Sequence, residues 1–285
     1  MRVGVCILPE DPWPVASQKW RQAEEWGFDH AWTYDHLAWR DLRDGPWHGA
    51  IPTLTAAATV TSTMRLGTLV ASPNFRHPVT FAREVVTLDD ISGGRLTLGI
   101  GAGGDGWDAT ILGHETLTPG ARADRFEEFV VHLDRLLTDR EASFHGAFFI
   151  AVDARAYPGC VQQPRVPFAL AATGPRGMRL AARYADTWVT TGVRDYDEPL
   201  DPRRGALVVA GQMRALDAAC SAVGRDPLTI KRLVLTDFQL APALDAFAEA
   251  KRAYEDAGVT DLVVHWPRAN EPFAGDVEML RTLNR

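Results

Sequence analysis

The 285-residue chain contains little cysteine and no long apolar run. The three cysteines, Cys6, Cys160 and Cys220, are odd in number and far apart, so the sequence predicts neither a disulfide framework nor a zinc knuckle. No apolar run approaches the ~20 residues of a membrane helix, and the apolar stretch near Met1 is too short for the core of a signal peptide. We therefore expect a soluble, cytoplasmic protein that does not associate with a membrane.

Signals for several other function classes are missing too. The formal net charge is −7 and no basic stripe interrupts the acidic residues, which argues against nucleic acid as a partner. The chain has no HExxH motif, no cluster of His and Cys at metal-ligand spacing, no GxSxG elbow and no Walker loop. The sequence thus disfavours metal-dependent hydrolysis and serine catalysis, and it predicts no metal site.

Short β-rich apolar runs alternate with helix-period segments along nearly the whole chain, which is typical of parallel strands joined by helices. Eight such units at this length predict one domain, residues 1–285, folded as a (β/α)8 TIM barrel. The predicted strands are Val3–Leu8, Phe28–Thr33, Leu66–Val70, Leu96–Ile100, Phe168–Ala171, Thr187–Thr190, Leu228–Leu235 and Asp261–His265.

Glycines and two irregular stretches refine this pattern. Gly27 and Gly258 stand where helices should end, because glycine accepts the left-handed conformation of a helix C-terminus. Residues 142–150 alternate around Gly146 and predict a small inserted hairpin. Residues 192–205 are polar and predict a loop, which we interpret as a lid, since insertions at the carboxyl ends of barrel strands commonly cover the ligand.

The first candidate for chemistry is the pair Asp35 and His36, directly after the second predicted strand. Histidine is suited to moving a proton near neutral pH, and this end of a barrel strand is where catalytic residues stand. A histidine that only hydrogen-bonds within its loop is the alternative.

The second candidate is the segment Leu96–Asp108, which contains a GxGxxG pattern at Gly99, Gly101 and Gly104. A dinucleotide fingerprint should close the first strand of a βαβ unit and open directly into a helix, and this one does neither. We therefore disfavour a nicotinamide dehydrogenase. The glycines instead indicate that the backbone approaches a flat, bulky ligand.

The third candidate lies between a predicted strand and a helix, at residues 173–176. Exposed N–H groups at a helix start, with the hydroxyl of Thr173 and the guanidinium of Arg176 nearby, are typical of a phosphate site. On pattern alone, the segment with Ser72 and Asn74 is an ordinary loop after a strand.

Taken together, the DH pair at residues 35–36, the segment LGTLVASPNFRHPVTFAREVVTLDDISGGRLTLGIGAG and the segment GPRGMRLAARYADTW resemble the luciferase-like monooxygenase family in the same order. This resemblance covers nearly the whole chain. It implies a (β/α)8 barrel that binds a reduced flavin, either FMN or the deazaflavin coenzyme F420, at the carboxyl ends of the strands.

The resemblance also implies roles for individual residues. Leu69 and Val70 should form a non-prolyl cis peptide behind the flavin ring, and Asp35 and His36 should stand near the ring as the catalytic pair. The other expected cofactor-binding residues are Ser72 and Asn74 at the polar edge of the ring, Gly101, Ala102, Gly103 and Gly104 along the cofactor and its ribityl chain, and Thr173, Gly174, Pro175 and Arg176 at the phosphate.

Departures from the family decide which cofactor we prefer. Deazaflavin-dependent sugar-phosphate dehydrogenases of the family carry a Glu where this chain has Gly104, which argues against that reaction. Trp39 stands one residue away from the position of their active-site Trp. The chain is shorter than the two-component FMN monooxygenases. We therefore expect F420-dependent hydride transfer to or from a small organic substrate, with a reduced-FMN monooxygenase served by a separate flavin reductase as the alternative.

A flavin-binding protein without turnover is an alternative of another class, and an F420 reductase is a possible separate partner. Trp13, Trp39, Trp47 and Trp107 stand in expected loops, where each either lines an apolar pocket or only packs. By resemblance we expect a homodimer through the helices that follow the second and third strands.

Overall fold

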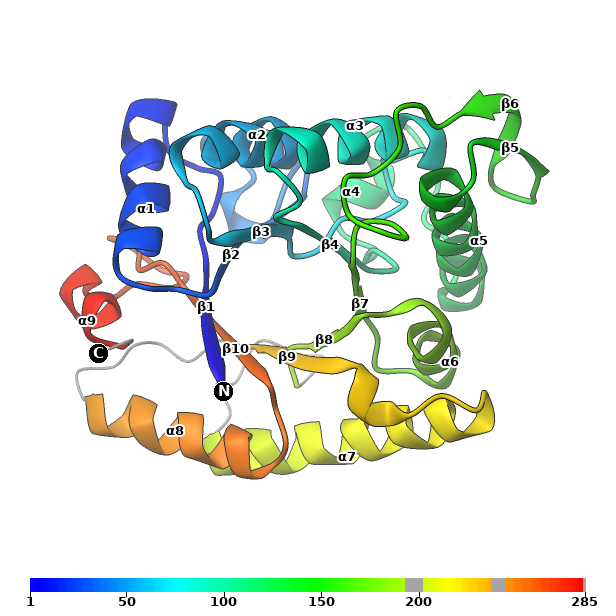
Figure 1. Ribbon diagram of the computed structural model, residues 1–285. Helices are drawn as coiled ribbons and strands as arrows, with labels where there is room; N and C mark the ends of the chain where they lie inside the picture. Colours follow the sequence, from blue (N-terminus) through cyan, green and yellow to red (C-terminus); the bar gives the residue numbers. More distant parts are fainter. Residues whose placement is uncertain (193–201, 237–243, 284–285) are drawn as a thin grey trace.

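The computed structural model describes residues 1–192, 202–236 and 244–283. Eight parallel strands form a closed barrel in the order β1-β10-β9-β8-β7-β4-β3-β2, and Figure 1 shows the helices as a ring around it. The register is continuous where the chain closes on itself: Arg2 of β1 lies opposite Asp261 of β10, and Cys6 lies opposite His265. The predicted (β/α)8 barrel is confirmed.

All eight predicted strands are present. They are β1 (Arg2–Cys6), β2 (His30–Thr33), β3 (Arg65–Thr68), β4 (Leu96–Ile100), β7 (Phe168–Ala171), β8 (Thr187–Thr190), β9 (Lys231–Leu235) and β10 (Asp261–His265). The largest difference from the prediction is at residues 228–229, which belong to the 3₁₀ helix η2 (Pro227–Thr229). The side chain of Asp226 accepts a hydrogen bond from the N–H of Leu228, so this segment forms a capped turn before β9 begins.

The helices pack their apolar faces on the outside of the barrel. They are α1 (Trp13–Glu25), α2 (Ala50–Val60), α3 (Pro78–Ile91), α4 (Trp107–Thr110), α5 (Pro119–Thr138), α6 (Pro175–Tyr184), α7 (Pro202–Ala222), α8 (Leu244–Asp256) and α9 (Val277–Thr282), with a short 3₁₀ helix η1 (Arg40–Leu42) after β2. Gly27 and Gly258 have φ values of 81° and 97°, as predicted for residues at helix ends. Among the described residues, no helix combines the length and apolar character needed to cross a membrane.

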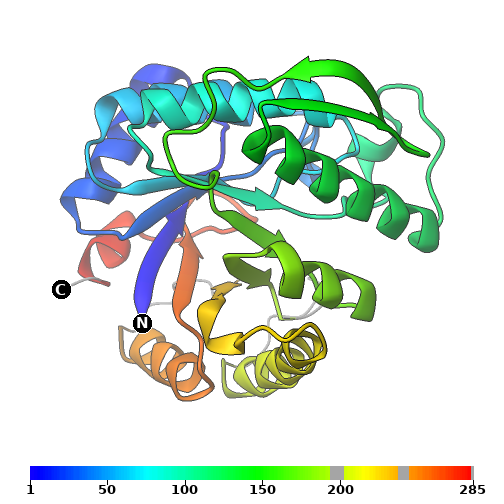
Figure 2. The same cartoon turned by 45° about the vertical axis from the view of Figure 1, so that its right-hand side comes forward.

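The predicted hairpin is present and is longer than expected. It consists of β5 (Glu141–His145) and β6 (Ile150–Arg155), which pair antiparallel, and it lies beside α3 and α5, outside the barrel (Figure 2). The predicted loop at residues 192–205 is wrong at its end, because α7 already begins at Pro202, a residue well suited to the first turn of a helix. Residues 193–201, and with them the interpretation as a lid, lie outside the described residues.

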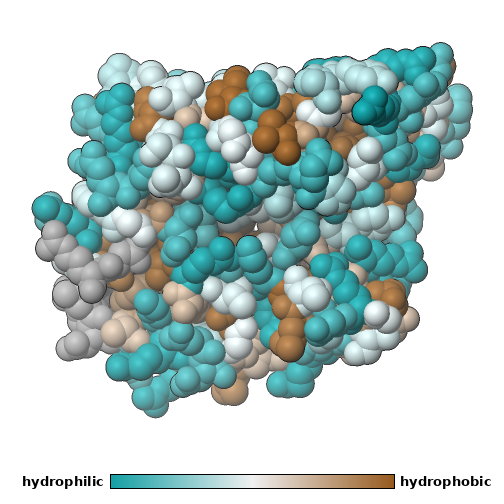
Figure 3. All heavy atoms as spheres, in the orientation of Figure 1, coloured by the Kyte–Doolittle hydropathy of each residue, from teal (hydrophilic) through white to brown (hydrophobic). Residues whose placement is uncertain are grey.

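The buried side chains form two layers. The outer layer contains the apolar faces of the helices and the outward-facing strand residues. The inner layer fills the barrel and alternates with the outer one along each strand, so that Leu233 and Leu235 face inward and Val234 faces outward. Figure 3 shows that one face of the molecule is mainly hydrophilic, with hydrophobic residues in separate small groups. The inner layer is the one that reaches the cavity described next.

Candidate active site

A cavity of about 570 Å³ lies at the carboxyl ends of the barrel strands. Its size is within the ordinary range of small-molecule and cofactor sites. The sequence-predicted residues that line it are His36, Leu69, Val70, Ser72, Asn74, Gly101, Ala102, Gly103, Gly104 and Thr173. The structure thus brings together in one cavity residues that are separated by more than a hundred positions in the sequence.

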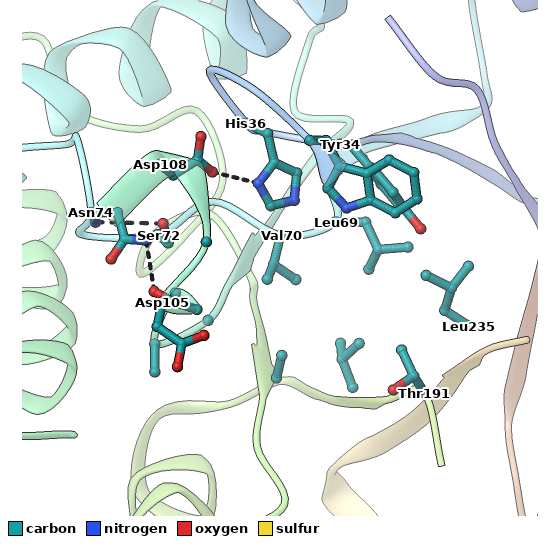
Figure 4. Close-up of a pocket in the computed structure, with 18 of the residues that line it drawn as sticks. Tyr34, His36, Leu69, Val70, Ser72, Asn74, Asp105, Asp108, Thr191 and Leu235 are labelled. Carbon is teal, nitrogen blue, oxygen red and sulfur yellow. Dashed lines mark hydrogen bonds and ion pairs between the residues drawn. The ribbon is translucent and has the colours of Figure 1, made fainter. Parts of the chain in front are cut away.

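His36 points into this cavity and is held by a carboxylate that the sequence analysis did not identify (Figure 4). Its Nδ1 lies 2.5 Å from Oδ2 of Asp108, at the start of α4. The other oxygen of Asp108 accepts hydrogen bonds from the backbone N–H groups of Leu37 at 2.7 Å and Ala38 at 3.1 Å. Asp108 therefore fixes both the ring of His36 and the loop that carries it.

Asp35 occupies a different environment from its neighbour. It is buried and does not line the cavity, and its carboxylate forms a bidentate ion pair with Arg76, at 2.5 Å to Nε and 2.8 Å to Nη2. Arg76 also contacts Glu84 of α3 at 2.8 Å. Asp35 thereby connects the loop after β2 to the loop that precedes α3, and unlike His36 it lies outside the cavity lining.

The peptide between Leu69 and Val70 is cis, as the resemblance implied. Two glycines pass close to this segment. A Cβ atom on Gly101 would lie 2.7 Å from Cγ2 of Val70, and one on Gly103 would lie 2.5 Å from Oδ1 of Asn74. Larger residues at these two positions would push into the cavity wall, so the backbone itself forms part of the lining.

Ser72 and Asn74 are both buried, and Asn74 is engaged by its neighbours. Its side-chain Nδ2 donates to the carbonyl of Gly104 at 3.2 Å, and its Oδ1 accepts from Arg125 of α5. The hydroxyl of Ser72 lies 3.4 Å from the backbone N of Asn74. These contacts connect the loops after β3 and β4 at one end of the cavity.

The predicted phosphate segment is only partly at the cavity. Thr173 lines it and Gly174 caps α6, but Gly174, Pro175 and Arg176 are not in the lining. The guanidinium of Arg176 contacts Asp124 at 2.5 Å and Glu127 at 3.3 Å, both on α5. Arg176, which the sequence predicted as a phosphate-binding side chain, is therefore paired with two carboxylates.

Aromatic side chains also line the cavity. Of the four tryptophans considered in the sequence, Trp39 and Trp107 line the cavity, Trp47 stacks on Trp39, and Trp13 is not in the lining. Trp47 also donates from its indole nitrogen to the carbonyl of His36 at 2.8 Å. Within the described part of the chain, no group of His, Cys, Asp or Glu has the arrangement of a metal site.

Comparison with known proteins decides the family. Residues 1–257 match the family described as luciferase-like monooxygenase. The chain belongs to this family. It is 36% identical over 295 residues to an F420-dependent glucose-6-phosphate dehydrogenase of Beutenbergia cavernae, an alignment covering 87% of this chain and 86% of that relative.

Two further proteins show how far the similarity extends. The chain is 29% identical to an F420-dependent hydroxymycolic acid dehydrogenase of Mycobacterium tuberculosis, with 88% of this chain and 71% of that one covered. A solved F420-dependent secondary alcohol dehydrogenase, in complex with an F420-acetone adduct, superposes with a TM-score of 0.78, covers 99% of this chain and 96% of its own, and is 18% identical. At that identity, the likeness of this luciferase-like chain to the solved structure shows that the two share a fold.

Proposed function

We propose that this chain is an F420-dependent oxidoreductase that transfers a hydride between the cofactor and a small organic substrate. The observation that carries the proposal is the pair His36 and Asp108 on the wall of a cavity that glycine backbone helps to line. The relatives that are 29–36% identical and are named as F420-dependent dehydrogenases support the choice of cofactor.

The cavity suits a flat tricyclic ring. Gly101 and Gly103 leave space that a Cβ atom would fill, and the apolar side chains of Leu69 and Val70 offer a surface for a ring face. In this proposal Leu69, Val70, Gly101, Ala102, Gly103 and Gly104 hold the ring and its chain, Ser72 and Asn74 lie at its polar edge, and Thr173 with the N–H groups at the start of α6 receives the phosphate.

His36 acts in this proposal as the proton donor or acceptor. Its Nδ1–H donates to the carboxylate of Asp108, which leaves Nε2 as the ring atom that can accept a proton from a substrate hydroxyl. Bound F420 supplies the two-electron chemistry, because its C5 accepts or returns the hydride. Asp108 is a positioning residue that fixes the tautomer and the orientation of His36, and Asp35 holds the loop from behind.

The titration below distinguishes this proposal from two alternatives. The first is a monooxygenase that uses reduced FMN and O₂ with a separate reductase, and the family's description as luciferase-like monooxygenase favours it. The second alternative is a flavin-binding protein without turnover.

Titration of the purified chain with F420 and FMN, each oxidised and reduced, tests the proposal by fluorescence quenching. We expect F420 to bind at least tenfold more tightly than either form of FMN. Preference for reduced FMN would contradict the proposal and favour the monooxygenase. Binding of F420 without reduction by any alcohol, or oxidation by any carbonyl compound, would favour the protein without turnover.

We also propose that the chain forms a homodimer through α2 and α3, as the family resemblance implies. Light scattering at micromolar concentration is the test. A mass of one chain would contradict it.

A further inference from the structure

We propose that the substrate part of the cavity takes an uncharged alcohol, or the corresponding carbonyl compound, that carries an apolar substituent, and that it does not take a sugar phosphate. The inference rests on the proposed function and adds the substrate class to it. Three features of the cavity carry it: the residues of one wall, the way their rings are held, and the charges within reach.

Tyr34, Trp39, Leu69 and Leu235 form what we call the apolar wall. Tyr34 and Leu69 are each 5% exposed and Leu235 is 4% exposed. Figure 4 shows Tyr34, Leu69 and Leu235 on the side of His36 that is away from Asp108, whereas Ser72, Asn74 and Asp105 lie on the other side. The wall continues into the apolar interior of the barrel, so a substrate on this side of His36 meets mainly hydrocarbon, with Thr191 as a polar lining residue on the same side (Figure 4).

The aromatic rings of this wall are fixed by their neighbours. Trp39 stacks against Trp47 and Phe273 with centroid separations of 6.4 and 5.9 Å, and Tyr34 meets its edge at 5.2 Å. The hydroxyl of Tyr34 lies 2.8 Å from Nε2 of His265. Its polar atom is therefore bound to a buried histidine, and the surface that a substrate meets is preformed and apolar.

The charges within reach do not suit a phosphate. Among the described lining residues the acidic and basic side chains are His36, Arg40, Asp105 and Asp108. Asp108 holds His36, Asp105 pairs with Arg122 at 3.3 Å, and the guanidinium of Arg40 lies 5.5 Å from the ring centroid of Trp39. A phosphate monoester carries about −1.5 to −2 charges and needs several charge-assisted donors when it leaves water. One arginine beside two carboxylates does not provide them.

The chemistry of the step follows from His36. The hydroxyl proton of the alcohol passes to Nε2 of His36, the C–H bond breaks with transfer of a hydride to F420, and a C=O bond forms. The alcohol is oxidised and F420 is reduced. A carbonyl compound is the product, and its apolar substituent remains against the apolar wall.

Binding of ketones to the chain loaded with oxidised F420 tests the inference without turnover. We expect the Kd, followed by F420 fluorescence, to fall about fourfold for each added methylene from 2-butanone through 2-hexanone, until the cavity is filled. Glucose 6-phosphate should bind more weakly than 2-hexanone. A Kd that is independent of chain length, or tighter binding of glucose 6-phosphate, would overturn the inference.

Variants of Trp39 test whether the gain in affinity per methylene comes from the apolar wall. Trp39→Ala should reduce the gain per methylene to less than twofold, and Trp39→Phe should restore most of it. Trp13→Ala is the matched control, because Trp13 does not line the cavity, and it should keep the fourfold gain. A Trp39→Ala chain that keeps the gain would overturn the inference. If Trp39→Ala does not fold, the ketone series measured on wild type and on Trp39→Phe still tests the inference.

Rates separate this inference from the proposed function. Loss of F420 absorbance with 2-hexanol is expected from both, whereas the absence of a reaction with glucose 6-phosphate is expected from the inference alone. Reduction by glucose 6-phosphate in preference to 2-hexanol would overturn the inference and leave the proposed hydride transfer standing. Length-dependent binding of ketones without reduction of F420 by any alcohol would leave the inference standing and contradict the proposed function.

Discussion

Two histidine–aspartate pairs of the described residues lie at opposite ends of the barrel. His30 and Asp261 stand where β2 and β10 begin, with Nε2 of His30 3.0 Å from Oδ1 of Asp261. His36 follows the carboxyl end of β2 and meets Asp108 at 2.5 Å. The side chains of the first pair are 5% and 2% exposed, and those of the second are 31% and 6% exposed.

The second ring nitrogen distinguishes the two pairs. In His30, Nδ1 accepts a hydrogen bond from the indole of Trp32 at 2.7 Å, so both ring nitrogens are used within the protein. In His36, Nδ1 is held by Asp108 and the ring lines the cavity. The pair whose histidine has both nitrogens engaged holds two strands together, whereas the pair whose histidine lines the cavity carries the proton transfer proposed above. Barrel enzymes place their chemistry at the carboxyl ends of the strands, where His36 stands.

The largest effect is expected from His36→Ala. Removal of a general acid or base lowers rates about 10²- to 10⁴-fold, and we expect kcat/KM for F420 reduction to fall by that factor. Thermal stability should change less than in Asp261→Ala, because His36 is partly exposed and Asp108 keeps its hydrogen bonds from the backbone of Leu37 and Ala38. His48→Ala, an exposed histidine in the same loop, is the control and should keep the wild-type rate. An unchanged rate in His36→Ala with F420 bound would remove His36 from the mechanism.

Asp261→Ala should give the opposite result. The variant leaves His30 and Arg2 without their buried carboxylate, so we expect a loss of about 3 kcal/mol in the free energy of unfolding, measured by urea denaturation. The rate per folded molecule should stay within twofold of wild type. Asp256→Ala, at an exposed position, is the control for stability. A rate loss comparable to that of His36→Ala would show that the two pairs are not separate.

The same carboxylate gives this pair a pH dependence. Burial opposes ionisation of Asp261, but hydrogen bonds from His30, Thr260 and Arg2 outweigh it and lower its pKa to about 2. Because the pKa is depressed in the folded state, the stabilisation is present above about pH 4 and is lost as the pH falls toward 2. Asp261→Ala should therefore show a weaker loss of stability than wild type over this interval.

Asp108→Asn should lower the rate by a smaller factor than His36→Ala. The amide can still accept from the backbone of Leu37 and Ala38, but its nitrogen offers a donor to Nδ1 of His36 and favours the wrong tautomer. We expect kcat to fall about 10- to 100-fold while the Kd of F420 changes less than twofold. Asp105→Asn is the matched control in the same loop. Equal losses in both variants would indicate an effect of charge alone.

The contact of Asp108 with His36 is a part of the site that could not be predicted from the sequence. His36 could be predicted because it follows a strand directly, in a barrel whose eight strands are readable from their alternation with helices. Asp108 stands seventy-two residues later, and neither spacing nor period links it to His36. Its position after the fourth strand was the one available signal, since the carboxyl ends of parallel barrel strands converge.

Asp35 and Arg176 show the opposite case, in which the sequence predicted a site residue that the structure places outside the cavity lining. Residue type and position made both candidates for a ligand site, and each is engaged by a charged partner from another element: Asp35 by Arg76, and Arg176 by Asp124 and Glu127. Sequence patterns predict which end of a strand a residue occupies. Which partner neutralises a charge depends on helix packing, which no local pattern encodes.

A third histidine, His265, is expected to give the smallest effect, on the pH dependence of stability. His265 ends β10 at the carboxyl side of the barrel, yet it is buried between Tyr34 and Phe273, whose ring stacks on it at 3.5 Å. Burial lowers the pKa of His265 to about 3, although a hydrogen bond with the backbone of Thr236 opposes the shift. Location at the carboxyl end is therefore not sufficient for proton transfer near neutral pH.

This depressed pKa predicts a stability effect with a definite sign. The unfolded chain binds a proton at His265 below about pH 6.5 and the folded chain does not until about pH 3, so stability falls as the pH falls through this window. Between pH 6.5 and 5.5 wild type should lose about 1 kcal/mol more than His265→Gln, measured by urea denaturation. Glutamine can still accept from Tyr34 and donate to the backbone. His114→Gln, at an exposed position, should behave as wild type. Identical pH dependence in wild type and His265→Gln would mean that His265 takes up its proton in the folded chain and that its burial does not keep it neutral.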